Sequence, residues 1–485
     1  MAFVLSSFIS FLSEISGLKY EWTFYLFFQT FAMLSAIAYR NVLHPNNASV
    51  FSRHVFAIVC GLIIAVCSYS WNSLHLVVQS TIPYIVIRFV SPRYAHVIVF
   101  TFTMLYLSAE HLRQQLAGIR ADTDHMAPMM INVQKVTTIA FSIHDGFSEN
   151  SSKLTKRQKE LATRRIPSFI EYYSYIFHFQ NLTAGPFCFY NHYIDFVEGK
   201  HVVPYKIKRA DGREIVIHKE PPVTFAVLGK LFQALIMLAV VLGIGDSHPI
   251  EGNVADTMLK SSVLHRISYM MVSILRAQSK YIFAWSVADA ICNASGLGFN
   301  GYDENGVPRW NFMTNINVPG FWMASSLTGT VANWHIPTRL WLKYVFYDRV
   351  PYLKDALTFA LTAVWHGFFP GYYWTNATMV LTLLASRKVR YNVRPYFTST
   401  QTRKLFYDVV TWIFHHVSLA YMTVPFVMLH NAPIVKFYRS VYFCGHIVTL
   451  VLILVLPGRK ASKRIAADQE HTVTTTQNDY HKKEQ

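Results

Sequence analysis

Long apolar segments, separated by short polar breaks, recur along most of this chain of 485 residues. Residues 22–39, 55–69, 75–90 and 94–109 follow one another in this way. A helix needs about 20 mostly apolar residues to cross a bilayer. Only 15% of the residues are charged, whereas soluble domains average about a quarter. The chain is therefore predicted to be an integral membrane protein that crosses the bilayer many times.

The charge pattern excludes some functions. The formal net charge of +17 lies mainly in loops between apolar segments, which favours contact with anionic membrane lipids over nucleic acid. The five cysteines have no paired spacing, and no group of His, Cys, Asp and Glu has the spacing of metal ligands. We therefore expect no metal site and no bound cofactor.

Two apolar segments contain features that conflict with a simple crossing. Residues 126–143 include Gln134 and Lys135, and a lysine at a lipid-facing helix centre costs about 3 kcal/mol. Lys135 is therefore predicted to face a protein interior or a water-filled cavity. Residues 169–190 lie between two strongly basic loops, so the positive-inside tendency favours a re-entrant segment that turns near Gly185-Pro186.

The C-terminal third contains one amphipathic segment and one unusual histidine. Residues 337–347 are predicted to form an in-plane helix with an apolar face and a basic face. Residues 357–365 are apolar but too short to span comfortably, and residues 356–386 contain no Asp, Glu, Lys or Arg. His366 lies within this uncharged region. An ionisable ring in such an environment is costly unless it is used or satisfied.

The last residues, 458–485, are polar and charged and are predicted to be a disordered cytosolic tail. Lys482 and Lys483 stand fourth and third from the C-terminus, the spacing of a dilysine retrieval signal. This pattern predicts a multi-pass protein of the endoplasmic reticulum membrane with a cytosolic C-terminus. The sequence leaves the oligomeric state open, with a homodimer as one option.

Polar groups that a structural role explains poorly gather in two stretches, Asn333-Trp334-His335 and Trp365-His366-Gly367. From the residues alone, His366 is as consistent with a structural histidine as with a functional one.

Several motifs, in order along the chain, carry a family resemblance. They are Gln134-Lys135 through His144-Asp145-Gly146, Pro167-Ser168-Phe169, Ala184-Gly185-Pro186, Tyr193-Ile194-Asp195, Phe283-Ala284-Trp285, Trp341-Leu342-Lys343 to Asp348-Arg349, and Trp365-His366-Gly367 to Pro370-Gly371-Tyr372. With them the chain resembles the membrane-bound O-acyltransferase (MBOAT) family. Within that family it is most similar to the lysophospholipid acyltransferase branch, and there to the subgroup that acylates lysophosphatidylethanolamine and lysophosphatidylserine.

The resemblance implies an all-α, polytopic fold with roughly 9–11 transmembrane helices. Re-entrant and in-plane helices would surround a buried catalytic chamber, and residues 1–457 would form a single domain. It also implies acyl transfer from acyl-CoA, as co-substrate, to the hydroxyl of a lysophospholipid. His366 matches the family's catalytic histidine and would act as the general base.

The second catalytic position of the family is usually Asn in the lysophospholipid enzymes, whereas this chain has His335. Asn333, two residues earlier, is the alternative source of an amide. Trp334 and Trp365 flank the two histidines and are expected to contact substrate. Arg339 and Lys343, together with Arg349, are candidates for binding the phosphates of acyl-CoA.

Three alternatives remain at this stage. The acceptor of the same reaction could be a peptide, a sterol or another small alcohol. The polar residues inside the membrane could belong to a transporter or a lipid scramblase. The presence of His335 in place of Asn leaves open a catalytically inactive scaffold.

Overall fold

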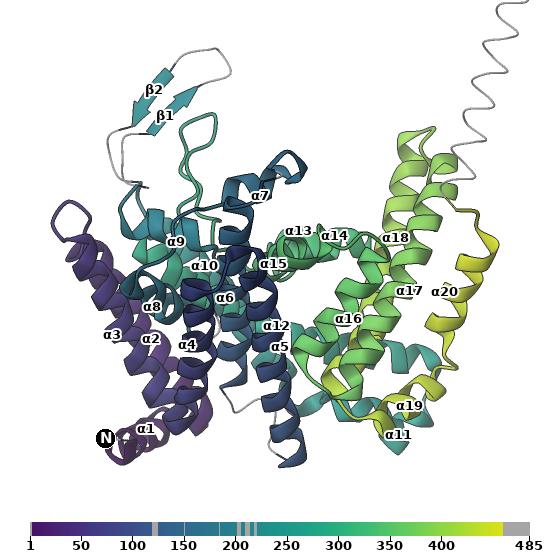
Figure 1. Ribbon diagram of the computed structural model, residues 1–485. Coiled ribbons are helices and arrows are strands. Elements are labelled where there is room, and N and C mark those ends of the chain that lie inside the picture. Colours follow the sequence, from purple (N-terminus) through teal and green to yellow (C-terminus); the bar gives the residue numbers. More distant parts are fainter. Residues whose placement is uncertain are drawn as a thin grey trace, which may run out of the picture. The chain divides into compact units, whose positions relative to one another are not determined.

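The computed structural model describes residues 2–118, 125–149, 151–183, 185–200, 205–208, 214–217 and 221–458 (Figure 1). Apart from one hairpin, the regular elements of these residues are helices. The hairpin pairs β1 (Tyr205–Lys208) with antiparallel β2 (Glu214–Ile217), within the second basic loop. The predicted all-α membrane fold is therefore confirmed, with the hairpin as a small addition. The dilysine pair lies outside the described residues.

The chain divides into two compact units. The first comprises the described residues of Met1–Ser247, Leu275–Val318 and Val331–Phe368, and the second those of His248–Ile274, Pro319–Thr330 and Phe369–Gln485. The predicted single domain, 1–457, stays a prediction.

The helices that lie in the first unit, or mostly in it, are α1 (Ala2–Ser16), α2 (Tyr20–Asn41), α3 (Val50–Tyr69), α4 (Ser73–Phe89), α5 (Pro92–Leu116), α6 (Met126–Gly146), α7 (Lys156–Leu161), α8 (Phe169–Phe177), α9 (Tyr190–Val197), α10 (Thr224–Ile244), α12 (Val263–Ser295), α15 (Ile336–Leu342) and α16 (Lys354–His366). Those that lie in the second unit, or mostly in it, are α11 (Asp256–Leu259), α13 (Val318–Trp322), α14 (Leu327–Asn333), α17 (Pro370–Asn392), α18 (Gln401–Met428), α19 (Asn431–Ser440) and α20 (Cys444–Val455).

Helix α6 lies at the centre of the first unit, where it packs against α4, α5 and α8. Nearly all of its residues are buried, polar ones included. Lys135 is 1% exposed, and its Nζ donates to Ile176 O at 2.8 Å and to Asn181 Oδ1 at 3.0 Å. The prediction that Lys135 faces the protein interior is confirmed. The bond to Ile176 O also holds the end of α8 in place.

Residues 169–190 do not form one continuous helix. Helix α8 has nine residues, which is too short to cross a bilayer, and a 3₁₀ turn (Phe179–Asn181) follows it. Gly185 then passes close to Asn181, because a Cβ at position 185 would lie 2.3 Å from Asn181 Cα. The segment is therefore broken here and buried over most of its length, as a re-entrant segment requires. The re-entrant path through the membrane stays a prediction.

Four helical stretches of the described residues are long and apolar enough to cross a membrane: Val50–Phe89, Pro92–Leu116, Thr224–Ser247 and Gln401–Met428. Helices α19 and α20, bent by 72° at a short break, would make a fifth if they form one span. Helix α20 has only 12 residues, fewer than a crossing by a single helix needs. The total of 9–11 crossings stays a prediction.

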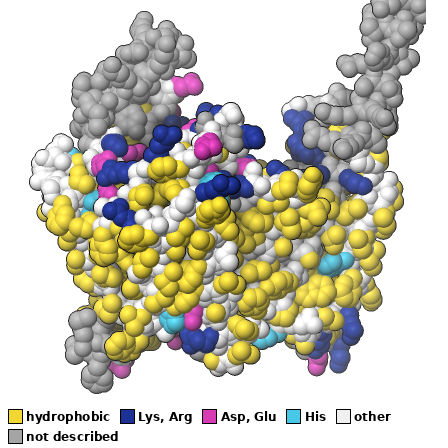
Figure 2. All heavy atoms as spheres, in the orientation of Figure 1, with side chains coloured by type: hydrophobic (Ala, Val, Ile, Leu, Met, Phe, Trp, Pro, Cys, Tyr) yellow, Lys and Arg dark blue, Asp and Glu magenta, His cyan; other side chains and the backbone are white. Residues whose placement is uncertain are grey.

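Side-chain types on the first unit follow the pattern of a membrane protein. Figure 2 shows hydrophobic side chains over the middle of its visible face, with Lys and Arg side chains gathered on the side where α7 lies in Figure 1. Helix α7 carries Lys156, Arg157 and Lys159 from the first basic loop. Basic loops beside an apolar band suit contact with anionic lipid headgroups.

Residues 336–347 form α15 and a π-helical turn (Lys343–Tyr347) that continues it. Trp341, Tyr344 and Val345 are buried on one face, whereas Lys343 is exposed. The predicted two-faced helix is confirmed. Helix α16 has 13 residues, too few to span, as its sequence also predicted.

Candidate active site

His366 is the last residue of α16, where the helix ends because Gly367 adopts a φ of +118°. A side chain at position 367 would collide with α5, since a Cβ there would lie 2.9 Å from His111 Nδ1. The His111 ring instead contacts the turn directly, with Nε2 3.1 Å from Trp365 O. The α5 helix therefore fixes the backbone on both sides of His366. Figure 1 shows α5 and α16 of the first unit next to each other, in agreement with their packing.

The buried Trp365 side chain positions the His366 ring. The side chain of Trp365 is 2% exposed, and its Nε1 donates to Met130 O of α6 at 3.2 Å. The His366 ring packs edge-on against the Trp365 ring at 4.7 Å between centroids and is half-buried. A fixed tryptophan thus limits the orientations that the histidine ring can take.

His335 approaches the same tryptophan from α15, with 6.1 Å between the centroids of its ring and the Trp365 ring. His335 and His366 are also close enough to interact electrostatically. His335 immediately precedes α15 and has a left-handed backbone, with φ of +48°. Such a conformation is unfavourable for a residue with a Cβ and is found mostly where the surroundings enforce it. The structure therefore brings together the two histidines that the sequence predicted as catalytic.

A chain of two hydrogen bonds, through Thr338 to Gln134, orients the His335 ring. Its Nε2 lies 2.9 Å from Thr338 Oγ1, and Gln134 Nε2 of α6 donates to the same hydroxyl at 3.0 Å. Trp285 of α12 stacks on the other side of the ring at 4.9 Å. The sequence named Gln134 and Trp285 only as parts of motifs, and neither was predicted as a site residue. Their place in those motifs was the available signal.

Asn333 and Trp334 are held beside this group. Asn317 Nδ2 donates to Asn333 Oδ1 at 2.9 Å, and Trp334 packs edge-on against Trp285 at 5.0 Å. This hydrogen bond with Asn317 occupies the side-chain carbonyl oxygen of Asn333. His335 is therefore better placed than Asn333 to act together with His366.

The basic residues predicted to bind the phosphates of acyl-CoA differ in whether they already form ion pairs within the protein. Lys343 pairs with Asp348 and lies over the Tyr347 ring. Arg349 forms a bidentate ion pair with buried Asp145, in which Nη1 donates to Oδ1 at 2.9 Å and Nη2 donates to Oδ2 at 2.7 Å. This pair identifies Arg349 as a structural residue, so it is a poor candidate for binding acyl-CoA.

Arg339 has a different environment, because its buried Nε has no hydrogen-bond acceptor among the described residues. The same holds for Arg157 of α7, which lies close enough to Arg339 for their charges to interact. Burial lowers the pKa of the Arg157 guanidinium; Glu160 opposes this shift, and the positive charge of Arg339 adds to it. Two neighbouring guanidinium groups with unsatisfied donors are suited to bind an anion.

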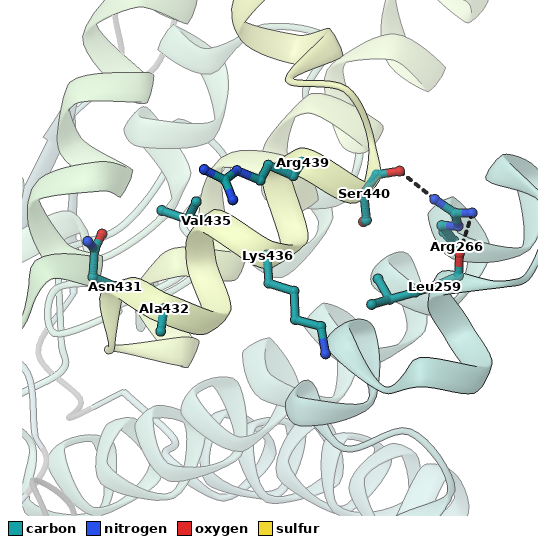
Figure 3. A pocket seen from close by; sticks show the side chains of 8 residues that line it. All are labelled: Leu259, Arg266, Asn431, Ala432, Val435, Lys436, Arg439 and Ser440. Atoms are coloured by element: carbon teal, nitrogen blue, oxygen red, sulfur yellow. Dashed lines mark hydrogen bonds between the residues drawn. The ribbon is translucent and has the colours of Figure 1, made fainter.

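A cavity lies in the second unit (Figure 3). It is an open groove of about 820 Å³ along α19. Arg266 at its side is engaged with the backbone carbonyls of Ser440 and Leu259. None of the predicted site residues lines this groove. Among the described residues, one cluster with metal-ligating atoms, His75, Glu110 and His125, lies in the first unit.

Comparison with known proteins agrees with this geometry. Residues 82–428 match the model of the MBOAT, membrane-bound O-acyltransferase family. The chain is 40% identical over 443 residues to membrane-bound glycerophospholipid O-acyltransferase 2 of Homo sapiens, which covers 90% of this chain and 85% of that protein. It is 37% identical over 458 residues to membrane-bound glycerophospholipid O-acyltransferase 1 of Homo sapiens, with 93% and 92% covered. It is also 39% identical to lysophospholipid acyltransferase 6 of Drosophila melanogaster, over 92% of this chain and 62% of that one.

Proposed function

Because the chain belongs to the membrane-bound O-acyltransferase family, we propose that it transfers a fatty acyl group from acyl-CoA to the free hydroxyl of a lysophospholipid. The names of its relatives support this acceptor, since they are glycerophospholipid and lysophospholipid acyltransferases. The lysophospholipid headgroups that we propose are ethanolamine, serine and choline. The reaction is a step of phospholipid remodelling.

The observation that carries the proposal is that His335 and His366 meet at one fixed tryptophan, Trp365. A glycerol hydroxyl is a poor nucleophile until a base removes its proton, and a neutral imidazole can accept that proton. His366 takes that proton as the oxygen attacks the thioester carbonyl. The carbonyl oxygen becomes an oxyanion, and collapse of the intermediate releases coenzyme A as its thiolate. No covalent acyl-enzyme is needed.

His335 supports His366 in this scheme. Held by Thr338 and stacked on Trp285, its ring is oriented before substrate binds. From that position it orients His366 or donates a hydrogen bond to the oxyanion. Both histidines come from one chain, and the homodimer that the sequence left as an option stays a prediction.

His335→Asn tests whether a hydrogen-bond donor is sufficient at this position. The amide of Asn can donate but cannot carry a proton as imidazolium, so we expect kcat to fall less than tenfold. His335→Ala, which removes the donor, should cost about 10²-fold or more, the typical loss of one oxyanion donor. Initial rates with purified protein measure both. Equal losses in the two variants would show that the imidazole itself is required.

The paired guanidinium groups provide the proposed site for the phosphates of acyl-CoA. A phosphate placed between Arg157 and Arg339 would accept hydrogen bonds from both unsatisfied Nε atoms and relieve the repulsion between the two charges. Lys343 contributes at the edge, because its charge is shared with Asp348. Arg157 thus joins Arg339 and Lys343 as a residue that binds substrate.

Replacing Arg157 or Arg339 by glutamine should raise the KM for acyl-CoA by about tenfold or more with little change in kcat, since a hydrogen bond to a charged group contributes about 1.5–3 kcal/mol. The matched control is Lys159→Gln, an exposed basic residue on the same helix as Arg157. Steady-state kinetics at saturating lysophospholipid measure the effect. A KM equal to that of the wild type in both arginine variants would rule out this phosphate site.

We further propose that the protein resides in the endoplasmic reticulum membrane with its C-terminus in the cytosol. Lys482 and Lys483 support this assignment, because a dilysine signal functions only on the cytosolic side.

An acyl-transfer assay on membranes containing the protein tests the function itself. Labelled acyl-CoA is offered together with lysophosphatidylethanolamine, lysophosphatidylserine or lysophosphatidylcholine, and product phospholipid is measured by mass spectrometry. We expect product with at least one headgroup. Product with a sterol, peptide or small alcohol and none with any lysophospholipid would instead support another acceptor. The absence of any acyl transfer would support the transporter or scaffold alternatives.

A further inference from the structure

Three side chains with metal-ligating atoms meet in the first unit, and none of them is among the groups that carry the proposed reaction. They are His75 near the start of α4, Glu110 on α5 and His125 just before α6. His125 is 0% exposed and Glu110 is 8% exposed, whereas His75 is half-buried. Sequence spacing gave no sign of this cluster, because its members come from three different segments.

We propose that His75, Glu110 and His125 bind a divalent transition metal ion, with Zn²⁺ as the best match. Two imidazoles and one carboxylate are a common ligand set for zinc. Imidazole also suits other transition metals, whereas Mg²⁺ and Ca²⁺ prefer oxygen ligands alone. This proposal does not depend on the proposed function.

The distances fit a zinc centre after a small adjustment. His75 Nδ1 lies 3.5 Å from one oxygen of Glu110, and His125 Nε2 lies 3.6 Å from the other. Zn–N and Zn–O bonds of about 2.0–2.2 Å in a tetrahedron place ligand atoms roughly 3.3–3.5 Å apart. All three ligand atoms lie within 4.8 Å of one another, so the two imidazole nitrogens need to approach each other by about 1.5 Å at most. The two rings are already stacked, with 4.9 Å between centroids.

Two neighbours would respond to the metal. Arg113, which is exposed, donates to a Glu110 oxygen at 2.9 Å and therefore competes with a cation for that carboxylate. The Tyr106 hydroxyl lies 2.9 Å from His75 Nδ1 and would have to release that nitrogen. A water molecule would complete the tetrahedron.

The position of the cluster indicates a structural role. A metal held by these residues would join α4, α5 and the start of α6, the three helices that pack around the centre of the unit. Glu110 is followed on α5 by His111, which contacts Trp365 O beside His366. The ion would therefore stabilise the end of α5 that positions the catalytic turn, without touching the substrate.

Metal binding by the full-length protein in detergent tests this inference. The protein is stripped with a chelator, and Zn²⁺ or Co²⁺ is then titrated alone, with metal content and thermal stability as readouts. We expect one equivalent of tightly bound metal, a Tm that rises when metal is added, and Co²⁺ absorption bands typical of tetrahedral coordination. His265→Gln, which removes an exposed histidine outside the cluster, should bind like the wild type.

Two variants are expected to change affinity in opposite directions. Glu110→Gln keeps the size of the side chain but weakens binding at least tenfold, because it removes the anionic ligand. Arg113→Gln removes the competing cation and should strengthen binding several-fold. The proposal is overturned if the wild type shows no stoichiometric binding, or if folded Glu110→Gln and His125→Gln bind as tightly as it does. Weaker binding by Arg113→Gln, with a Tm that does not respond to metal, would also overturn it and show that the cluster is an ion pair only.

Discussion

Replacing His366 by alanine should reduce the rate of acyl transfer by about 10²–10⁴-fold, the range that a positioned general base contributes. No other group takes over easily, because His335 is committed to Thr338 and His111 to the Trp365 carbonyl. The fold should survive, since Trp365 and Gly367 keep their contacts with α6 and α5. Initial rates and acyl-CoA affinity measured on the same purified sample separate chemistry from binding.

The expected pattern for His366→Ala is a large loss in kcat with acyl-CoA affinity within a few-fold of the wild type. His265→Gln serves as the control for the loss of a histidine elsewhere in the chain. Full turnover by His366→Ala would exclude His366 as the base, even though the family assignment would stand.

Removing the carboxylate of Asp145 should destabilise the protein by about 3–5 kcal/mol, the cost of leaving a buried charge without its partner. Asp145 accepts two hydrogen bonds from Arg349 and one from the Tyr344 hydroxyl, at 2.9 Å. This group joins the end of α6 to the segment that follows the π-helical turn. Because that segment continues α15, removing the Asp145 carboxylate should also displace His335 and lower the rate of acyl transfer.

Thermal melting of Asp145→Ala and of the double variant Asp145→Ala, Arg349→Met measures this effect. Replacing a buried ion pair by apolar groups costs much less than breaking it, so the double variant should melt at a higher temperature than the single one. If both melt at the same temperature, the loss at Asp145 does not arise from an unpaired arginine.

The sequence predicted those features that depend on local pattern. Apolar length marked the spans and showed α16 to be too short, and the two basic loops pointed to the broken segment around Gly185. The cost of a lysine in lipid predicted that Lys135 is internal, and it donates to Ile176 and Asn181. These predictions succeed because each depends only on the sequence of one segment and on whether lipid, water or protein surrounds it.

Contacts between distant segments could not be predicted in this way. Gln134 and Thr338 are 204 positions apart, and no periodicity indicates that they share a hydrogen bond. The proximity of Arg157 to Arg339 and the His75–Glu110–His125 cluster are of the same kind. Even the pairing of His335 with His366 came from the family resemblance rather than from spacing. Such contacts are set by helix packing, which hydropathy does not encode.

The most direct test of the central claim is a reconstituted reaction. The purified protein is placed in vesicles with acyl-CoA and lysophosphatidylethanolamine, and free CoA thiol and new diacyl phospholipid are measured together. We expect the two products in equal amounts, with formation that depends on the lysophospholipid and is lost in His366→Ala. Release of CoA without phospholipid, or no reaction with any of the three lysophospholipids, would contradict the proposed function.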